Sequence, residues 1–236
     1  MDASELLGLL AHALAGIDPA MPMPSRLCRA CVEILGAQSG ALTVAAAPDE
    51  RLTVSTSDGM SEEIEDLEDV LGEGPGRLAF TENRTIVAEI DHHDSAADAF
   101  PVFSQLVEPI TGPATFVAVP MHIGGRVVGV LSLFFTTGRP VREEKDVQFL
   151  ADAVGLSLVS ELDSLDWSSR SRIHQATGMV TAQLRISPED ALAVLRAHAF
   201  AASTTLEAVA EEIVQRRVAF IRDESNVVKT ERTEES

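Results

Sequence analysis

The chain has 236 residues, 45% of them hydrophobic, and a formal net charge of −19. This length suits two modest domains, each with a core, and the composition is that of a folded protein. The N-terminus lacks the basic region of a signal peptide, and no apolar stretch is long enough to cross a bilayer, so we expect a cytoplasmic protein. The only cysteines, Cys28 and Cys31, exclude a disulfide framework, and we interpret them as small buried residues of one helix.

The first elements alternate between helical and strand patterns. Residues 4–14 and 25–36 have helical apolar spacing, and residues 41–47 and 51–57 are predicted to pair as a hairpin. A helix follows at 61–71, whose many acidic residues we interpret as a solvated face.

A glycine-rich turn, "GEGPG", precedes a helix that is expected to begin at Pro75. It follows a helix and contains no lysine, so it is not a phosphate-binding loop. Further on, "TFVAVPMHI" and "RVVGVLSLFF" are joined by Gly124-Gly125, which is typical of a two-residue hairpin turn. The pattern predicts an antiparallel sheet carrying helices on one face.

The candidate metal ligands of this region are weak. His92 and His93 lie beside Asp91 and Asp94, but adjacent residues of an extended segment point apart and no third ligand has suitable spacing. We interpret them as a polar loop and His122 as an ordinary surface or half-buried strand residue. We expect neither a metal site nor a resident cofactor, although a small-molecule ligand of unknown identity is compatible with this half. No catalytic motif occurs, so we expect no enzyme activity.

Residues 142–165 form one helix with an apolar seam. Its spacing suits a coiled coil between two chains as well as docking on the helix's own sheet, so a homodimer through this helix is one of two interpretations. The seam consists of Val147, Leu150, Val154, Leu158, Leu162 and Leu165.

Three short helices follow, and their charge sets them apart. Residues 1–166 carry nine basic residues against 27 acidic ones, whereas residues 167–222 carry seven arginines against five acids. Ser187-Pro188 and the capping-box pattern from Thr204 to Glu207 mark the starts of the second and third helices. The acidic residues 223–236 are expected to form a flexible tail.

The first of these helices, "RIHQATGMVTAQLR", contains Gly178 on the face opposite Ile173, Val180 and Leu184. A glycine inside a helix costs about 0.8–1 kcal/mol relative to alanine. A bare strip edged with arginines would let unstacked bases approach the helix while the arginines meet phosphates. The alternative is that Gly178 packs against another helix of this chain or of a second chain.

Residues 168–218 resemble an ANTAR domain, an RNA-binding three-helix module of bacterial transcription antitermination regulators. The matching pattern includes Ile173, Ala176 and Gly178, the step from Ser187 to Ala191, and Leu206 to Ile213, although Thr177 stands where such domains often have lysine. The resemblance implies binding of paired RNA stem-loops with six-base loops by a dimer. It assigns RNA contacts to Arg172, Gln175, Ala176, Gly178, Arg185 and Arg196.

Residues 20–160 resemble a GAF domain, a sensor fold, through "LGEGPGRLAF", "AEIDHHD", "FPVFSQ" and "AVPMHIGGRVVGVLSLFF". We therefore expect an α+β chain. It would comprise a GAF-like sensor at 1–141, a linker helix at 142–167, an all-α three-helix ANTAR bundle at 168–222 and a tail at 223–236. Two alternatives remain open. One is a DNA-binding regulator, and the other is a ligand sensor whose helical domain contacts only protein.

Overall fold

The computed structural model describes residues 2–45, 51–90, 99–160, 168–222 and 228–232. The chain divides into two compact units, and each is considered by itself. The N-terminal unit comprises residues 1–68 and 72–165, and the C-terminal unit comprises residues 166–236 together with residues 69–71. None of the helices in these ranges is long and apolar enough to span a membrane.

The N-terminal unit is built on a five-stranded antiparallel sheet with the strand order β2-β1-β5-β4-β3. The two predicted hairpins, β1 with β2 and β4 with β5, are both present. Gly124 and Gly125 take positive φ values of 57° and 79°, as a tight turn between twisted strands requires. The strands are β1 (Ser39–Ala45), β2 (Arg51–Thr56), β3 (Ile86–Ile90), β4 (Ala114–Ile123) and β5 (Arg126–Phe135).

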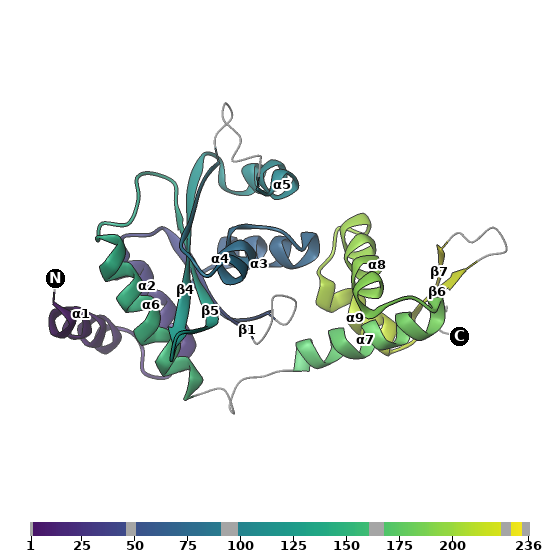
Figure 1. The fold of residues 1–236 in the computed structure, drawn as a ribbon, viewed down its shortest axis with the longest axis horizontal. Helices are drawn as coiled ribbons and strands as arrows, with labels where there is room; N and C mark the ends of the chain where they lie inside the picture. Colours follow the sequence, from purple (N-terminus) through teal and green to yellow (C-terminus); the bar gives the residue numbers. More distant parts are fainter. Residues whose placement is uncertain (1, 46–50, 91–98, 161–167, 223–227, 233–236) are drawn as a thin grey trace. The chain divides into compact units, whose positions relative to one another are not determined.

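Helices cover both faces of this sheet, not one face as the sequence pattern had suggested (Figure 1). One face carries α1 (Ala3–Gly16), α2 (Met23–Leu35) and α6 (Glu144–Val159); the other carries α3 (Gly59–Leu71), α4 (Pro75–Glu82) and α5 (Pro101–Thr111).

The reason lies in the strand side chains, which are apolar on both sides of the pleat. Val117 and Leu133 point into the core beneath α1, α2 and α6. Their neighbours Phe116 and Phe134 point the other way and meet edge to face at 5.0 Å between ring centroids. A sheet that is apolar on both faces needs a cover on each.

The apolar seam of α6 is used within this unit. Its described members Val147, Leu150, Val154 and Leu158 are at most 4% exposed and belong to the core beneath the sheet. Of the two interpretations, docking on the sheet is correct for these four residues, so this face is not available to a second chain. Leu162 and Leu165 lie outside the described residues.

The C-terminal unit contains the three expected helices, α7 (Ser168–Leu184), α8 (Pro188–Ala201) and α9 (Leu206–Val214). The predicted Ser187 cap is present, because its side chain accepts a hydrogen bond from the Asp190 N–H. The third helix is capped one residue later than the capping-box pattern from Thr204 to Glu207 predicts, since its N-cap is Thr205, whose side chain accepts a hydrogen bond from the Ala208 N–H. Aliphatic residues from all three helices fill one core: Ile173, Val180, Leu184, Leu195, Leu206, Val209 and Ile213.

A β-hairpin that the sequence did not suggest follows the bundle. Strands β6 (Val218–Arg222) and β7 (Val228–Arg232) pair antiparallel, so residues 228–232 are not the flexible tail we expected. Val218 and Phe220 are 1% and 3% exposed and join the helical core, where Phe220 meets the ring of His198 edge to face. The hairpin thus extends the bundle beyond its third helix.

Replacing Phe220 with alanine should destabilise the C-terminal unit by about 3–5 kcal/mol, because the substitution leaves a cavity beneath the hairpin. Native-state amide hydrogen exchange, which resolves the two units, provides the measurement. Ile221→Ala is the matched control, since Ile221 is 38% exposed on the same strand. Equal loss of protection in the two variants would show that the hairpin does not belong to the core.

Candidate functional site

The outward face of α7 is bare at its centre. Gly178 is exposed, and a Cβ atom added to it would meet nothing within 4 Å. This result confirms that the glycine faces outward and excludes close packing against another described helix of the chain. The exposed residues around it, here called the α7 strip, are Ser171, His174, Gln175, Gly178 and Ala182.

The opposite face of α7 fixes this orientation. Ile173, Val180 and Leu184 are at most 8% exposed and lie in the core of the bundle. A helix anchored by three such residues cannot rotate about its axis without exposing them, at about 1.5–3 kcal/mol for each buried aliphatic side chain. The strip is therefore held at the surface by the core behind it.

The six residues assigned to RNA contact are not all on this surface. Gln175, Gly178 and Arg185 are exposed, and Arg196 on α8 is half-exposed. Ala176, however, is 0% exposed and packs in the core, so its assignment to direct RNA contact is wrong. It lies three residues after Ile173, which puts both residues on the same face of the helix.

Arg172 is also engaged within the bundle. Its Nη2 lies 3.1 Å from Glu207 Oε1 and its Nε lies 3.1 Å from Glu211 Oε2, so the guanidinium ties α7 to α9. These groups are half-exposed, and such pairs contribute about 1 kcal/mol or less. An RNA phosphate therefore has to compete with two carboxylates for this arginine.

Two arginines occupy backbone conformations that favour glycine. Arg185, directly after α7, has a φ of +56°, and Arg216, two residues after α9, has a φ of +59°. Glycine commonly fills the left-handed position that ends a helix, because a Cβ atom is strained there. The sequence prediction included Arg185 but not Arg216, whose signal was its position two residues after the end of a helix.

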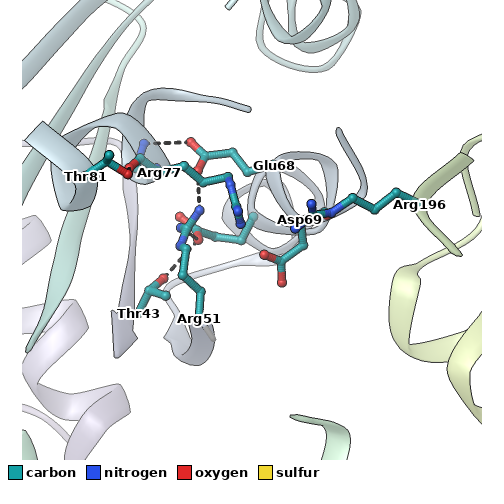
Figure 2. A network of polar contacts seen from close by, with 9 residues as sticks. Thr43, Arg51, Glu68, Asp69, Arg77, Thr81 and Arg196 are labelled. Atoms are coloured by element: carbon teal, nitrogen blue, oxygen red, sulfur yellow. Dashed lines mark hydrogen bonds and ion pairs between the residues drawn. The ribbon is translucent and has the colours of Figure 1, made fainter. Parts of the chain in front are cut away.

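The N-terminal unit buries an ion network (Figure 2). Arg51, 2% exposed, donates from Nη1 to Glu68 Oε2 at 2.7 Å and from Nη2 to Glu65 Oε2 at 2.9 Å. The Thr43 hydroxyl donates to the same Glu65 oxygen at 3.0 Å. The interpretation of the acidic helix as a solvated face is therefore wrong for Glu65 and Glu68, which point inward.

The same network explains the glycine-rich turn. Glu68 Oε1 accepts a hydrogen bond from the Gly76 N–H at 2.9 Å, and Glu68 Oε2 accepts one from the Arg77 N–H at 3.2 Å. A Cβ atom on Gly74 would lie 2.5 Å from the Glu68 side chain. The N-terminus of α4 thus binds a carboxylate of the protein itself, which leaves no phosphate cradle there.

Burial raises the pKa of Glu65 to about 7, although the neighbouring Arg51 guanidinium acts in the opposite direction. Burial also raises the pKa of both Cys28 and Cys31 to about 12, so these thiols are unreactive core residues.

His122 is a half-buried strand residue, as expected. Its Nδ1 lies 3.0 Å from Asp152 Oδ1 and its Nε2 lies 2.6 Å from Asn83 Oδ1. Over the described ranges, no group of three metal-ligating side chains comes together. His92, His93, Asp91 and Asp94 lie outside them.

Residues 25–156 match the family model of the GAF domain. The chain belongs to the GAF family. Residues 166–214 match the model of the ANTAR domain, so the chain combines a GAF domain with a C-terminal ANTAR domain. The ANTAR match ends before the β6–β7 hairpin, and the GAF match includes most of α6, which we had treated as a linker.

Several solved GAF structures are similar. The GAF domain of a Coxiella burnetii phosphoenolpyruvate-protein phosphotransferase is 17% identical over 70% of this chain and 98% of its own, with a TM-score of 0.47. The A. aeolicus nlh2 GAF domain in an inactive state is 16% identical over 68% and 96%, with a TM-score of 0.41. A GAF/HD domain protein of Geobacter sulfurreducens is 14% identical over 70% and 100%, with a TM-score of 0.42. No curated protein matches the chain.

Gly178→Ala should stabilise the ANTAR domain by about 0.8–1 kcal/mol, because alanine is the better helix former and the new methyl group meets nothing. Hydrogen exchange of the α7 amides gives the change in opening free energy. Gly8→Ala, at an equally open position of α1, is the control that should stabilise only the GAF domain. If Gly178→Ala lowered the stability of the ANTAR domain, an unrecognised close contact would lie at Gly178.

Glu65 should make the stability of the GAF domain depend on pH. Its folded pKa of about 7 lies above the ordinary 4.5, so the folded protein holds this proton more tightly and loses stability as pH rises from about 4.5 to 7. Glu65→Gln resembles the protonated form and does not titrate. The free energy of unfolding of the wild type, relative to this variant, should therefore fall across that interval in denaturant titrations.

Glu63→Gln is the control for Glu65, because it removes a carboxylate from the exposed face of the same helix. A wild-type minus Glu65→Gln difference that stays constant between pH 4.5 and 7 would contradict the burial of an ionisable Glu65.

Proposed function

We propose that the chain is a transcription antitermination regulator, in which the GAF domain controls an ANTAR domain that binds paired stem-loops of nascent RNA. The ANTAR match supports an RNA-binding output, and the observation that carries the proposal is the open strip at Gly178. A surface without side-chain bulk lets a flat, unstacked base approach the helix. Such a regulator acts in the cytoplasm, where transcripts are made.

The charges around the strip support a nucleic-acid partner. Arg185 is exposed at the end of α7, and residues 167–222 carry seven arginines against five acidic residues in an otherwise acidic chain. The acidic surface of the GAF domain repels phosphate and so disfavours binding of RNA there. Gln175, on the strip itself, offers both a donor and an acceptor to a base edge.

The proposed regulator is a homodimer. Since the inward seam of α6 is occupied by its own sheet, the dimer contact is assigned to the outward face of α6, where Leu156 is 63% and Val159 is 36% exposed. Two ANTAR domains held by one dimer would meet two linked RNA loops, and binding of the second loop then becomes intramolecular. A signal at the GAF domain would change the spacing of the two ANTAR domains.

Gly178→Glu should weaken binding of an RNA with two six-base stem-loops by about tenfold or more, equivalent to about 1.4 kcal/mol or more, because the carboxylate fills the strip and repels phosphate. Direct titration followed by native mass spectrometry gives both the affinity and the number of chains per RNA. Ala193→Glu, at an exposed alanine of α8, adds the same charge elsewhere on the domain and is the matched control.

The rival functions give different results in this titration. A DNA-binding regulator would bind duplex DNA more tightly than the RNA stem-loops. A sensor that contacts only protein would bind neither nucleic acid. If Gly178→Glu bound RNA with unchanged affinity, the α7 strip would not be part of the RNA-binding surface.

A further inference from the structure

A groove of about 430 Å³ lies between α7 and β6 in the ANTAR domain. It depends on the β-hairpin, because β6 begins at Val218 whereas the match to the ANTAR family ends at residue 214. The residues that line it are Met179, Ala182, Gln183, Arg216, Val218 and Ala219.

The walls of this groove are apolar. Met179 and Ala182 line it from α7, and Val218 and Ala219 line it from β6. The hairpin is held to the helix by Gln183, whose Oε1 accepts a hydrogen bond from the Phe220 N–H at 3.0 Å. An apolar wall that includes the polarisable thioether of Met179 suits the flat face of a nucleobase.

Polar groups of the lining suit the rest of a nucleotide. The side-chain amide of Gln183 carries two N–H donors, which can meet the oxygen and nitrogen acceptors of a base edge. The exposed guanidinium of Arg216 supplies positive charge for a phosphate. The groove also continues the α7 strip, because Ala182 belongs to both.

The backbone at Arg216 is left-handed, as it is at Arg185 and Ser203, which lie at the ends of the other two helices of the domain. Its φ of +59° is a conformation that glycine adopts without strain, whereas a residue with a Cβ atom loses about 1 kcal/mol or more there. An arginine at such a position lowers stability and presents a cation at the groove.

We propose that the groove between α7 and β6 binds one unpaired nucleobase of the RNA, with Arg216 contacting its phosphate, while the neighbouring loop bases lie on the α7 strip. The proposal rests on the RNA-binding function and adds the β6–β7 hairpin to the RNA-binding surface. It assigns RNA contact to Met179, Gln183 and Arg216, which the resemblance did not include.

The test combines a groove variant with RNAs that lack single bases. Ala219→Gln fills the groove from the hairpin side, outside the α7 strip, and Ala193→Gln is its control on α8. Each is titrated with the two-stem-loop RNA and with a series of RNAs that carry one abasic site in the loop or next to it. Loss of the base that the groove holds should weaken binding by about tenfold, equivalent to about 1.4 kcal/mol.

We expect Ala219→Gln to weaken binding of the intact RNA by about tenfold, and one abasic position to weaken binding by the wild type by a similar factor. When Ala219→Gln is combined with the RNA that is abasic at that position, the two losses of binding free energy should not add, because both changes remove the same contact. If the two losses of affinity multiplied at every abasic position, the proposal that the groove binds a base would be wrong. It would also be wrong if Ala219→Gln bound the RNA as tightly as Ala193→Gln.

A second variant covers the case in which Ala219→Gln disturbs the hairpin. Arg216→Gly relieves the backbone strain and should weaken RNA binding by about tenfold while the stability of the domain is unchanged or raised. Ser203→Gly is its control, since Ser203 is exposed and has a φ of +50° in the same domain. Unchanged affinity in Arg216→Gly would contradict the proposal.

The two proposals fail in different ways. If the wild type binds no RNA stem-loop, the RNA-binding function itself is wrong. If Gly178→Glu abolishes RNA binding while Ala219→Gln and Arg216→Gly do not alter it, the RNA-binding function stands and the proposal that the groove binds a base is wrong. A change of oligomeric state in Ala219→Gln without a change of RNA affinity would mean that the groove holds a protein segment.

Discussion

The fixed orientation of α7 about its own axis is the constraint on which the structure of the C-terminal surface depends. Ile173, Val180 and Leu184 anchor one side of the helix in the core, so Gly178 must face outward. Neither neighbour in the bundle covers this side. The bare strip is thus a product of ordinary core packing behind it, and no special backbone geometry is needed to expose it.

At two kinds of position, the ANTAR domain has a residue that the local backbone conformation disfavours. Gly178 stands inside a helix, where alanine is favoured, and Arg185 and Arg216 stand in left-handed positions, where glycine is favoured. Each departure lowers stability by about 1 kcal/mol, and all three lie at the surface. Arg185, Ser203 and Arg216 each follow the C-terminal end of a helix, where the left-handed conformation is common.

The GAF domain shows a different use of unfavourable groups. Arg51, Glu65 and Glu68 are removed from water on the sheet face beneath α3 and α4, where one guanidinium serves both carboxylates. Buried ion pairs add little net stability, yet loss of one partner leaves an uncompensated charge. The network therefore fixes how α3 and the start of α4 sit on the sheet.

The sequence predicts those features that local signals determine. Two hairpins follow from alternation and turn residues, and the three C-terminal helices follow from Ser187, Thr205 and their apolar spacing. The features it did not reveal depend on distant partners. Glu65 and Glu68 are buried only because Arg51 reaches them from another element.

The β6–β7 hairpin was missed for the same reason. Its strands are short and partly charged, and its stability comes from Val218 and Phe220 packing on helices earlier in the chain. The burial of Ala176 was available from helical spacing alone. Family likeness was the basis of its assignment to RNA, whereas the position three residues after Ile173 indicates the core.

Photocrosslinking tests the central claim most directly. The full-length protein is irradiated with a two-stem-loop RNA that carries 4-thiouridine in its loops, and the crosslinked peptides are identified by mass spectrometry. The account predicts crosslinks to residues 171–185 on the outward face of α7. Crosslinks confined to α8 or to the GAF domain, with none on α7, would contradict it.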